Sequence, residues 1–468
     1  MESDKVSQSK AGISSIPSVS WLGWRVAAAL IGGLVLRLWM LTAFPPIGGD
    51  SLIYGDLAKN ILLHGKFAIT DGSGILHSTL IRLPGYPLFL AASFRVFGAE
   101  HYNAVAFTQI ALELTASLLL ADFVRQISTP RAALNTLWLA ALCPFTAVYT
   151  IAPLTESLTF DMICLALWSL ERCLRTSSLL ACVLFTTAIS YAALLRPDGA
   201  LVAIALWPAL LLCRRPDGRS IFSFRRAILW GLLAVMPFFL WTARNWQVFH
   251  VVEPLAPRYA NDPGEDPRLG WQHWVKTWCL DFACTNDVYW NVPGNPLELD
   301  KLPQRAFDSP QQQTEMTALI AEYNNNDYEL TPEMDARFEQ LAQQRTATHP
   351  LRTYFRLPLG RLADMTLRPR VENLPIDLRW WEYDMHRAET RFSWAYAALN
   401  AFLLGIGLVG LLFRPRLWPY MLAYLALRSL LLLTIEAPES RYTLEFFPVL
   451  FALGGITLYR IFRSRSRA

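Results

Sequence analysis

The feature that most constrains this chain is a series of apolar blocks, each about 20 residues long, which is enough for a helix to cross a bilayer. Only 17% of the 468 residues are charged and 53% are hydrophobic, whereas a soluble domain carries about 25% charged residues. We therefore predict a mainly α-helical, polytopic membrane protein with about ten transmembrane helices. The predicted spans are 21–44, 103–124, 132–152, 154–170, 178–195, 198–213, 227–243, 394–413, 415–435 and 441–461.

Arginine and lysine residues gather in the short loops on one side of these spans. Because cytoplasmic loops carry an excess of these residues, this side is predicted to be cytoplasmic, with both termini inside. Two long segments, 45–102 and 244–393, then lie on the outer side. The expected organisation is an N-terminal membrane module at 1–243 that includes the first outer loop, an outer region at 244–393, and C-terminal membrane helices at 394–468.

The first outer loop opens with the sequence GGDSLIYGDLAKNILLHG at residues 48–65. Apolar residues recur at helical spacing after Asp50, which predicts an amphipathic helix on the outer membrane surface. Asp50 follows two glycines and has the chemistry of a helix N-cap, and a capping carboxylate can still present one oxygen to a substrate. Asp56 falls on another face of the helix and is predicted to be solvated.

The same loop continues with RLPGYPLFL at residues 82–90. At membrane level, Arg82 either extends to lipid head groups or binds a phosphate. The apolar segment 86–97 is too short to span a bilayer and is predicted to form an interfacial or re-entrant helix.

Taken in order, these motifs resemble membrane glycosyltransferases of the C-type fold. More narrowly, they resemble glycosyltransferase family 39 and its bacterial relatives, which include protein O-mannosyltransferases and lipid A aminoarabinose transferases. The shared features are a carboxylate after the first span, the following Tyr54 and Ala58, and the segments RLPGYPLFL, PLTESL (153–158), LRPDG (195–199) and PESRY (438–442). The chain has Asp50 and Ser51 where eukaryotic protein O-mannosyltransferases carry an Asp-Glu pair.

The resemblance implies a polyprenyl-phosphate-linked sugar as donor. The sequence agrees, because it lacks the D-x-D motif that is common in nucleotide-sugar enzymes, and a lipid phosphate can leave without a metal when cationic side chains take up its charge. We predict that Arg82, Arg196 and Arg441 converge on one phosphate site. Arg37, near the end of the first span, is a further candidate.

Asp50 is the predicted general base, which takes a proton from an acceptor hydroxyl while the sugar is transferred with inversion. A retaining reaction would use a second carboxylate as nucleophile, about 5 Å away. Glu156 ranks second to Asp50 as the acidic candidate. Arg428 and Glu113, both within predicted spans, are guessed to form an ion pair.

Other residues complete the predicted site and its partners. Neither a cofactor nor a metal is expected. The expected partners are membrane lipids, the lipid-linked sugar, and an acceptor hydroxyl on a glycan, lipid or protein, with no nucleic acid. We expect the chain in the inner (plasma) membrane, with its active site on the periplasmic or extracytoplasmic side. The remaining candidates for substrate binding are Tyr54, His77, Tyr86, Glu156, Glu439 and Tyr442.

The region 244–393 carries several local signals. Thr331 followed by Pro332 predicts the start of a helix. Cys279 and Cys284 are predicted to form a disulfide, and the alternative is that WCLDFAC at 278–284 is a core segment with unpaired cysteines. The tryptophans of this region could stack on sugars, but an interfacial belt or the core of a small domain is the expected arrangement; they are Trp246, Trp271, Trp274, Trp278, Trp290, Trp380 and Trp381. The segment 351–370 contains five arginines among apolar residues and is interpreted as a helix on anionic lipid.

Two other classes of function remain open at this point. A transporter or flippase for polyprenyl-linked saccharides would share the basic outer sites but would need a pathway with alternating access. A non-catalytic membrane scaffold would leave the carboxylate and the arginines without a role.

Overall fold

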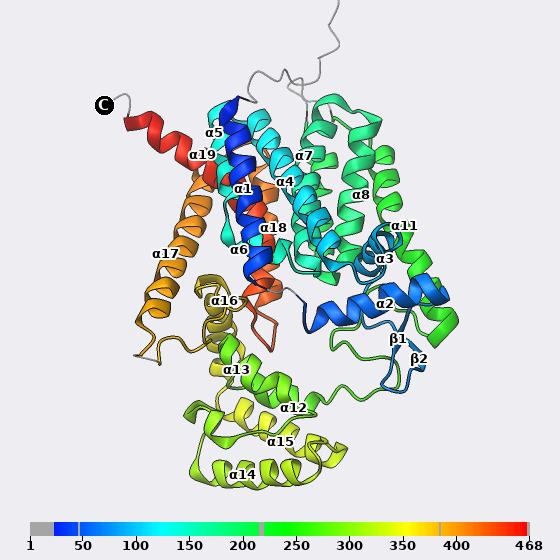
Figure 1. The fold of residues 1–468 in the computed structure, drawn as a ribbon, viewed down its shortest axis with the longest axis vertical. Coiled ribbons are helices and arrows are strands. Elements are labelled where there is room, and N and C mark those ends of the chain that lie inside the picture. The colour runs from blue at the N-terminus through cyan, green and yellow to red at the C-terminus, as the bar shows by residue number, and fades with distance from the viewer. Residues whose placement is uncertain (1–22, 45–46, 215–219, 383–384, 466–468) are drawn as a thin grey trace, which may run out of the picture.

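The computed structural model describes residues 23–44, 47–214, 220–382 and 385–465. These residues are mainly helical and form a helix bundle with a smaller helical subdomain beyond one end (Figure 1). The predicted mainly α-helical class is therefore confirmed.

The bundle is built from the first half of the chain and from the C-terminal segment that begins at Arg387. Its helices are α1 (Trp24–Ala43), α4 (Tyr102–Ile127), α5 (Pro130–Ala141), α6 (Pro144–Thr150), α7 (Thr155–Thr176), α8 (Leu179–Leu195), η2 (Pro197–Gly199), α9 (Ala200–Leu206), α10 (Ala209–Leu212), α11 (Phe224–Phe249), α17 (Arg387–Gly410), η7 (Leu411–Phe413), α18 (Trp418–Leu432), η8 (Ser440–Phe446) and α19 (Phe447–Arg465).

Each of the ten predicted spans coincides with one or more of these helices. In the described part of the chain, five helices are long and apolar enough to cross a membrane: Trp24–Ala43, Tyr102–Ile127, Phe224–Phe249, Arg387–Phe413 and Ser440–Arg463. A sixth candidate is the pair α5 and α6, which is bent by 55°. The total of ten spans stays a prediction.

The predicted span 132–152 is not one straight helix. Pro144 has no N–H to continue the hydrogen bonds of α5, and it occupies the first turn of α6 instead. The two helices therefore meet at a sharp bend rather than forming a continuous rod.

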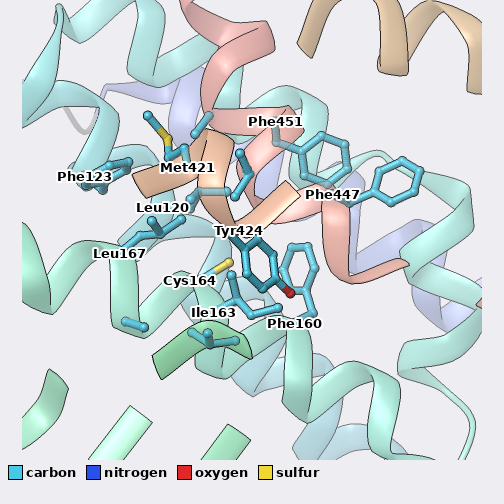
Figure 2. Packing of buried hydrophobic residues seen from close by; sticks show 14 of the residues in the cluster. Leu120, Phe123, Phe160, Ile163, Cys164, Leu167, Met421, Tyr424, Phe447 and Phe451 are labelled. Carbon is cyan, nitrogen blue, oxygen red and sulfur yellow. The ribbon is translucent and has the colours of Figure 1, made fainter. Parts of the chain in front are cut away.

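The core of the bundle lies where α4, α7, α18 and α19 meet (Figure 2). Aromatic and aliphatic side chains from all four helices interdigitate there, and the close van der Waals packing between them favours association of the helices within a membrane. The labelled members include Leu120, Phe123, Phe160, Ile163, Leu167, Met421, Tyr424, Phe447 and Phe451.

The first long loop forms α2 (Asp50–His64), a hairpin of β1 (Ala68–Thr70) and β2 (Leu76–Ser78), and α3 (Gly85–Phe97). Helix α2 lies crosswise to the long bundle helices, at the end that faces the subdomain (Figure 1). Gly85 allows α3 to begin against α8, because a Cβ at this position would lie 2.6 Å from the carbonyl oxygen of Leu194. The predicted helices at 50–65 and 86–97 are confirmed as helices.

The hairpin was not predicted, and it changes the role of Asp56. The carboxylate of Asp56 accepts hydrogen bonds from the backbone N–H of Thr70 at 2.6 Å and from Asn60 at 3.3 Å. The prediction that Asp56 is solvated was wrong, because the hairpin folds back over this face of α2.

The helical subdomain comprises α12 (Leu269–Lys276), α13 (Phe282–Asp287), α14 (Pro310–Asn325) and α15 (Pro332–Thr348), with short turns η3 (Tyr289–Asn291), η4 (Leu299–Lys301) and η5 (Gln304–Ala306) between them. Trp271, Trp274 and Trp278 are buried in its core, which confirms the core alternative for these three, whereas Trp246, Trp290 and Trp381 are exposed. Cys279 and Cys284 form the predicted disulfide. The Thr331 hydroxyl accepts from the N–H of Met334, which confirms the predicted start of α15.

The segment after the subdomain forms the π-helical turn η6 (Arg352–Arg356) and α16 (Leu357–Leu367). Its arginines do not form the expected lipid-facing set. Arg361 is fully buried and donates to the carbonyl oxygens of Cys279 and Lys276, and Arg370 donates to that of Ser440 at 2.7 Å. These side chains satisfy buried carbonyl groups that secondary structure leaves unpaired.

Candidate active site

A carboxylate held between two arginines lies at the start of α2. Arg82 Nη2 donates to Asp50 Oδ1 at 2.7 Å, and Arg441 Nη1 donates to Asp50 Oδ2 at 3.1 Å. The three side chains are between 20% and 26% exposed. They come from three separate segments, and Asp50 and Arg441 are 391 residues apart in the sequence.

The predicted N-cap role of Asp50 was wrong. Gly49 occupies the cap position with a φ of 52°, a conformation that favours glycine, and α2 has no side-chain cap hydrogen bond. Asp50 is instead the first residue of the helix, where the helix dipole stabilises a negative charge. Both of its oxygens are therefore available to the two arginines.

The segment that carries Arg82 is held from the end of α11 and the loop beyond it. Arg244 donates to the carbonyl oxygens of Thr79 and Phe67, each at 2.8 Å. The backbone N–H of Leu80 donates to Asp262 Oδ1 at 2.7 Å. These contacts fix the backbone just before Arg82, so that its guanidinium approaches Asp50 from a defined direction.

The charges around Asp50 decide its ionisation. Burial alone would raise the pKa of Asp50, but the positive charges and hydrogen bonds of Arg441 and Arg82 outweigh burial and hold the pKa below its usual value. Asp50 is therefore ionised at neutral pH.

Glu439 and Glu156 extend the site on the far side of Arg441. Arg441 Nε lies 2.5 Å from Glu439 Oε2 and 3.9 Å from Glu156 Oε1, and the hydroxyl of Tyr442 donates to Glu439. Burial raises the pKa of Glu439 despite the opposing charge of Arg441. Arg441 thus faces three carboxylates, and its position depends on all of them.

Arg196 belongs to the same network but is more enclosed. It pairs with Glu156 at 2.8 Å, with Asp198 at 3.1 Å and with Glu445 at 3.3 Å. Glu156 therefore connects Arg196 to Arg441. The structure brings the three predicted arginines into one network, in which Arg82 and Arg441 contact Asp50 directly, while their binding of phosphate stays a prediction.

The guessed ion pair between Arg428 and Glu113 is wrong. Arg428 Nη1 lies 3.0 Å from Asp198 and 2.5 Å from Glu445. Glu113 accepts instead from Arg37 Nε at 2.8 Å and Nη2 at 2.9 Å.

The fully buried Arg37 also donates to the carbonyl oxygen of Ala141 at 2.7 Å. This contact depends on Gly33, where a Cβ would lie 2.8 Å from the same oxygen, so that α1 comes close enough to α5. Arg37 is therefore an internal ion-pair partner, not an open phosphate site.

Sequence reasoning missed two members of the network, Asp198 and Glu445. Asp198 lies in the LRPDG motif but received no role of its own. Glu445 is a carboxylate within an otherwise apolar predicted span, and such a position marks an interior partner or a functional group. That signal was sufficient to find it. We refer to Asp50, Arg82, Glu156, Arg196, Asp198, Arg428, Glu439, Arg441 and Glu445 together as the charge cluster.

The remaining predicted substrate residues divide into three groups. Tyr54 and Tyr442 border the charge cluster, where Arg82 lies over the ring of Tyr54 at 6.0 Å and Arg441 over that of Tyr442 at 5.6 Å. Tyr86 is fully buried and donates to Gln109 at 2.6 Å, which makes it a core residue. His77 is exposed on β2 and pairs with Asp71 at 2.7 Å, and no contact brings it to the cluster.

Within the described ranges, no group of three or more His, Cys, Asp or Glu side chains is arranged to hold a metal ion. The acidic members of the charge cluster are paired with arginines. The expectation that no metal or cofactor is needed stays a prediction.

Residues 82–241 match the family described as dolichyl-phosphate-mannose-protein mannosyltransferase. This match confirms the resemblance to glycosyltransferase family 39 that the sequence motifs indicated. The match covers 160 of the 468 residues, so this segment of the chain is similar to that family of membrane glycosyltransferases. The matched segment includes Arg82, Glu156 and Arg196, while Asp50 and Arg441 lie outside it.

The solved structures that match this chain include AglB, the oligosaccharyltransferase of Archaeoglobus fulgidus. In complex with an inhibitory peptide and a dolichol-phosphate it has a TM-score of 0.45 and 15% identity, over 95% of this chain and 51% of that chain. Its apo form has a TM-score of 0.46 and 14% identity, over 96% and 51%. The chain thus spans about half the length of AglB.

ArnT from Cupriavidus metallidurans, bound to undecaprenyl phosphate, has a TM-score of 0.39 and 16% identity, over 95% of this chain and 78% of that chain. No curated protein matches the sequence.

Proposed function

We propose that this protein is an integral-membrane glycosyltransferase that moves a sugar from a polyprenyl-phosphate donor to an acceptor hydroxyl on the outer face of the membrane. The observation that carries the proposal is the placement of Asp50 between Arg82 and Arg441, at 2.7 and 3.1 Å. A carboxylate between two arginines combines a proton acceptor with two groups that bind phosphate. The family match to a dolichyl-phosphate-mannose enzyme supports the donor class.

In the proposed reaction, Asp50 accepts the proton of the acceptor hydroxyl as that oxygen attacks the anomeric carbon. The bond between this carbon and the phosphate oxygen breaks, and the lipid phosphate leaves with the electron pair. Arg82 and Arg441 take up the charge that develops on the leaving phosphate. A single displacement of this kind inverts the configuration of the sugar.

The same pair of arginines couples donor binding to the strength of the base. Without a phosphate, both guanidinium groups bind Asp50 and lower its pKa, which makes the carboxylate a weak base. A donor phosphate offers the arginines a competing anion with bidentate geometry. When they turn to the phosphate, the pKa of Asp50 rises, and the base becomes stronger while the donor is bound.

Arg196 has a different place in this proposal. Three carboxylates surround it, so we assign it to holding Glu156 and, through Glu156, the side chain of Arg441. Tyr54 and Tyr442 border the space around the arginines and are the proposed sugar-contacting residues.

The proposal is tested with purified protein in lipid nanodiscs and a synthetic polyprenyl-phosphate donor that carries a radiolabelled sugar. A mixture of envelope lipids, glycans and proteins serves as acceptor. We expect label to appear in an acceptor with release of polyprenyl phosphate. A protein that moves intact donor between the leaflets of a vesicle without releasing polyprenyl phosphate would instead be a flippase.

A further inference from the structure

The loop between α18 and η8, residues 433–439, is bound on several sides by segments outside the bundle. Arg258 Nη2 lies 2.8 Å from Glu436 Oε1 and 2.8 Å from the carbonyl oxygen of Thr434. Lys276, the last residue of α12, lies 2.7 Å from the same Glu436 oxygen. Glu436 therefore forms ion pairs with two cations that come from different parts of the chain.

The backbone of this loop is held as well. Arg361 donates to the carbonyl oxygen of Ile435 at 3.4 Å, and the Thr285 hydroxyl donates to that of Pro438 at 3.2 Å. Thr285 directly follows the disulfide between Cys279 and Cys284. The helical subdomain and α16 thus contact the loop on both sides of Glu436.

The next residues of the chain enter the charge cluster. Glu439 lies three positions beyond Glu436, and Arg441 five. Arg441 has its ion pair with Asp50 at 3.1 Å. The contacts at 434–438 restrict the backbone of residues 439–441, which follow directly. A displacement of Glu436 would therefore also displace Arg441, because only four residues separate them.

We propose that Glu436 is a positioning residue that couples the helical subdomain to the active site by holding Arg441 on Asp50. The inference rests on the proposed function for its catalytic consequence, while its geometric content is independent of that function. It assigns the subdomain a role in assembling the phosphate-binding arginines. An acceptor that displaces the subdomain would then act on catalysis through Glu436.

The charge state of Glu436 suits this role. Burial alone would raise the pKa of Glu436, but its contacts with Lys276 and Arg258 outweigh burial and hold the pKa below the usual value. The side chain is 10% exposed, and water therefore competes little for its oxygens. The pairing is partly buried, and removal of Glu436 leaves Lys276 and Arg258 without their shared counter-charge.

The test compares Glu436→Gln with wild-type protein in two measurements. The first is the rate at which phenylglyoxal, an arginine-specific reagent, modifies Arg441, with Arg82 as the internal reference. The second is kcat for sugar transfer from the synthetic polyprenyl-phosphate donor. In Glu436→Gln we expect phenylglyoxal to modify Arg441 several-fold faster than in the wild type, while the rate for Arg82 stays unchanged. We expect kcat to fall roughly 10- to 100-fold, because a displacement of about 1 Å in an active site can lower the catalytic rate 100-fold.

A matched control and a rescue variant separate positioning from general loosening. Glu322→Gln breaks an exposed ion pair with Arg337 in the same subdomain and should leave both measurements unchanged. Lys276→Met should act like Glu436→Gln in a milder form, since Arg258 remains on Glu436, and Lys276→Arg should restore both values. If Glu436→Gln does not fold, Lys276→Met decides by the same two measurements.

The outcomes are distinct. The positioning role would be overturned if phenylglyoxal modified Arg441 at the same rate in the wild type and the variants. It would also be overturned if the modification rates of Arg82 and Arg441 rose equally. A wild-type protein without any sugar transfer would refute the proposed function, and the phenylglyoxal rates would still decide whether Glu436 holds Arg441.

Discussion

Asp50 and Arg441 lie 391 residues apart in the chain, yet their side chains form an ion pair of 3.1 Å. Asp50 is the first residue of α2, which follows the first span, and Arg441 is the second residue of η8, which leads into the last helix, α19. The contact joins the first long loop to the segment before α19 and places a carboxylate beside a cation.

Arg82→Lys and Arg441→Lys should each weaken the binding of undecaprenyl phosphate. Lysine keeps the charge but cannot reproduce the planar, two-point contact of a guanidinium with phosphate. A hydrogen bond between charged groups contributes about 1.5–3 kcal/mol, so Kd should rise by roughly 10- to 100-fold. The measurement is ligand-induced thermal stabilisation in detergent. Arg131→Lys, an exposed arginine at the start of α5, is the matched control, and equal stabilisation of all four proteins would contradict the phosphate site.

The pH profile of transfer should report the ion pairs of Asp50. The folded pKa of Asp50 lies below its usual value, because burial is outweighed by the charges of Arg441 and Arg82, so its carboxylate keeps its charge at pH values where an ordinary aspartate begins to be protonated. Wild-type kcat/KM should therefore show no fall from Asp50 in that range. Arg441→Met removes one positive charge beside Asp50, while the burial that raises its pKa remains. The fall of kcat/KM at low pH, its acid limb, should therefore shift to a higher pH in this variant.

Glu439 provides the control for this profile, because burial raises its pKa and it also contacts Arg441. If the acid limb of Arg441→Met persists in the double variant with Glu439→Gln, it belongs to Asp50. An acid limb that disappears with Glu439→Gln assigns the titration to Glu439 and counts against the assignment of Asp50.

The buried pair of Arg37 and Glu113 should carry a large share of bundle stability. Glu113→Gln leaves the Arg37 guanidinium without its counter-charge, and breaking a buried pair in this way costs about 3–5 kcal/mol. Thermal unfolding in detergent, followed by size-exclusion chromatography, measures the loss. Arg337→Gln, which breaks an exposed pair, should cost less than about 1 kcal/mol. Equal thermal unfolding midpoints for Glu113→Gln and Arg337→Gln would show that the pair of Arg37 and Glu113 contributes little to stability.

The sequence predicted the outer grouping of Asp50, Arg82 and Arg441 because loop charges orient all the spans at once. Residues far apart in the chain were thereby assigned to one face. The disulfide and the start of α15 were also predictable, since each depends on a few neighbouring residues. Such signals are local or topological and need no knowledge of packing.

Partner choice inside the bundle was not predictable in the same way. Arg37 pairs with Glu113 because Gly33 allows α1 to approach Ala141, and Arg428 meets Asp198 and Glu445 because of how α18 is rotated. Such pairings depend on the rotation and depth of helices, which loop charges do not determine. The role of Glu436 required the subdomain to be placed against the bundle, and nothing in the sequence gives that placement.

The most direct test of the account is transfer by Asp50→Asn. Asparagine keeps the size of the side chain but cannot accept the proton. The variant should fold and bind undecaprenyl phosphate at least as tightly as wild type, because the arginines no longer have a competing carboxylate.

Its rate of sugar transfer from a polyprenyl-phosphate donor should fall by about 10²- to 10⁴-fold, the usual contribution of a general base. Asp71→Asn, an exposed carboxylate of the same loop, should transfer at the wild-type rate. Near-normal turnover by Asp50→Asn would contradict the central claim and move the search for the base to Glu156.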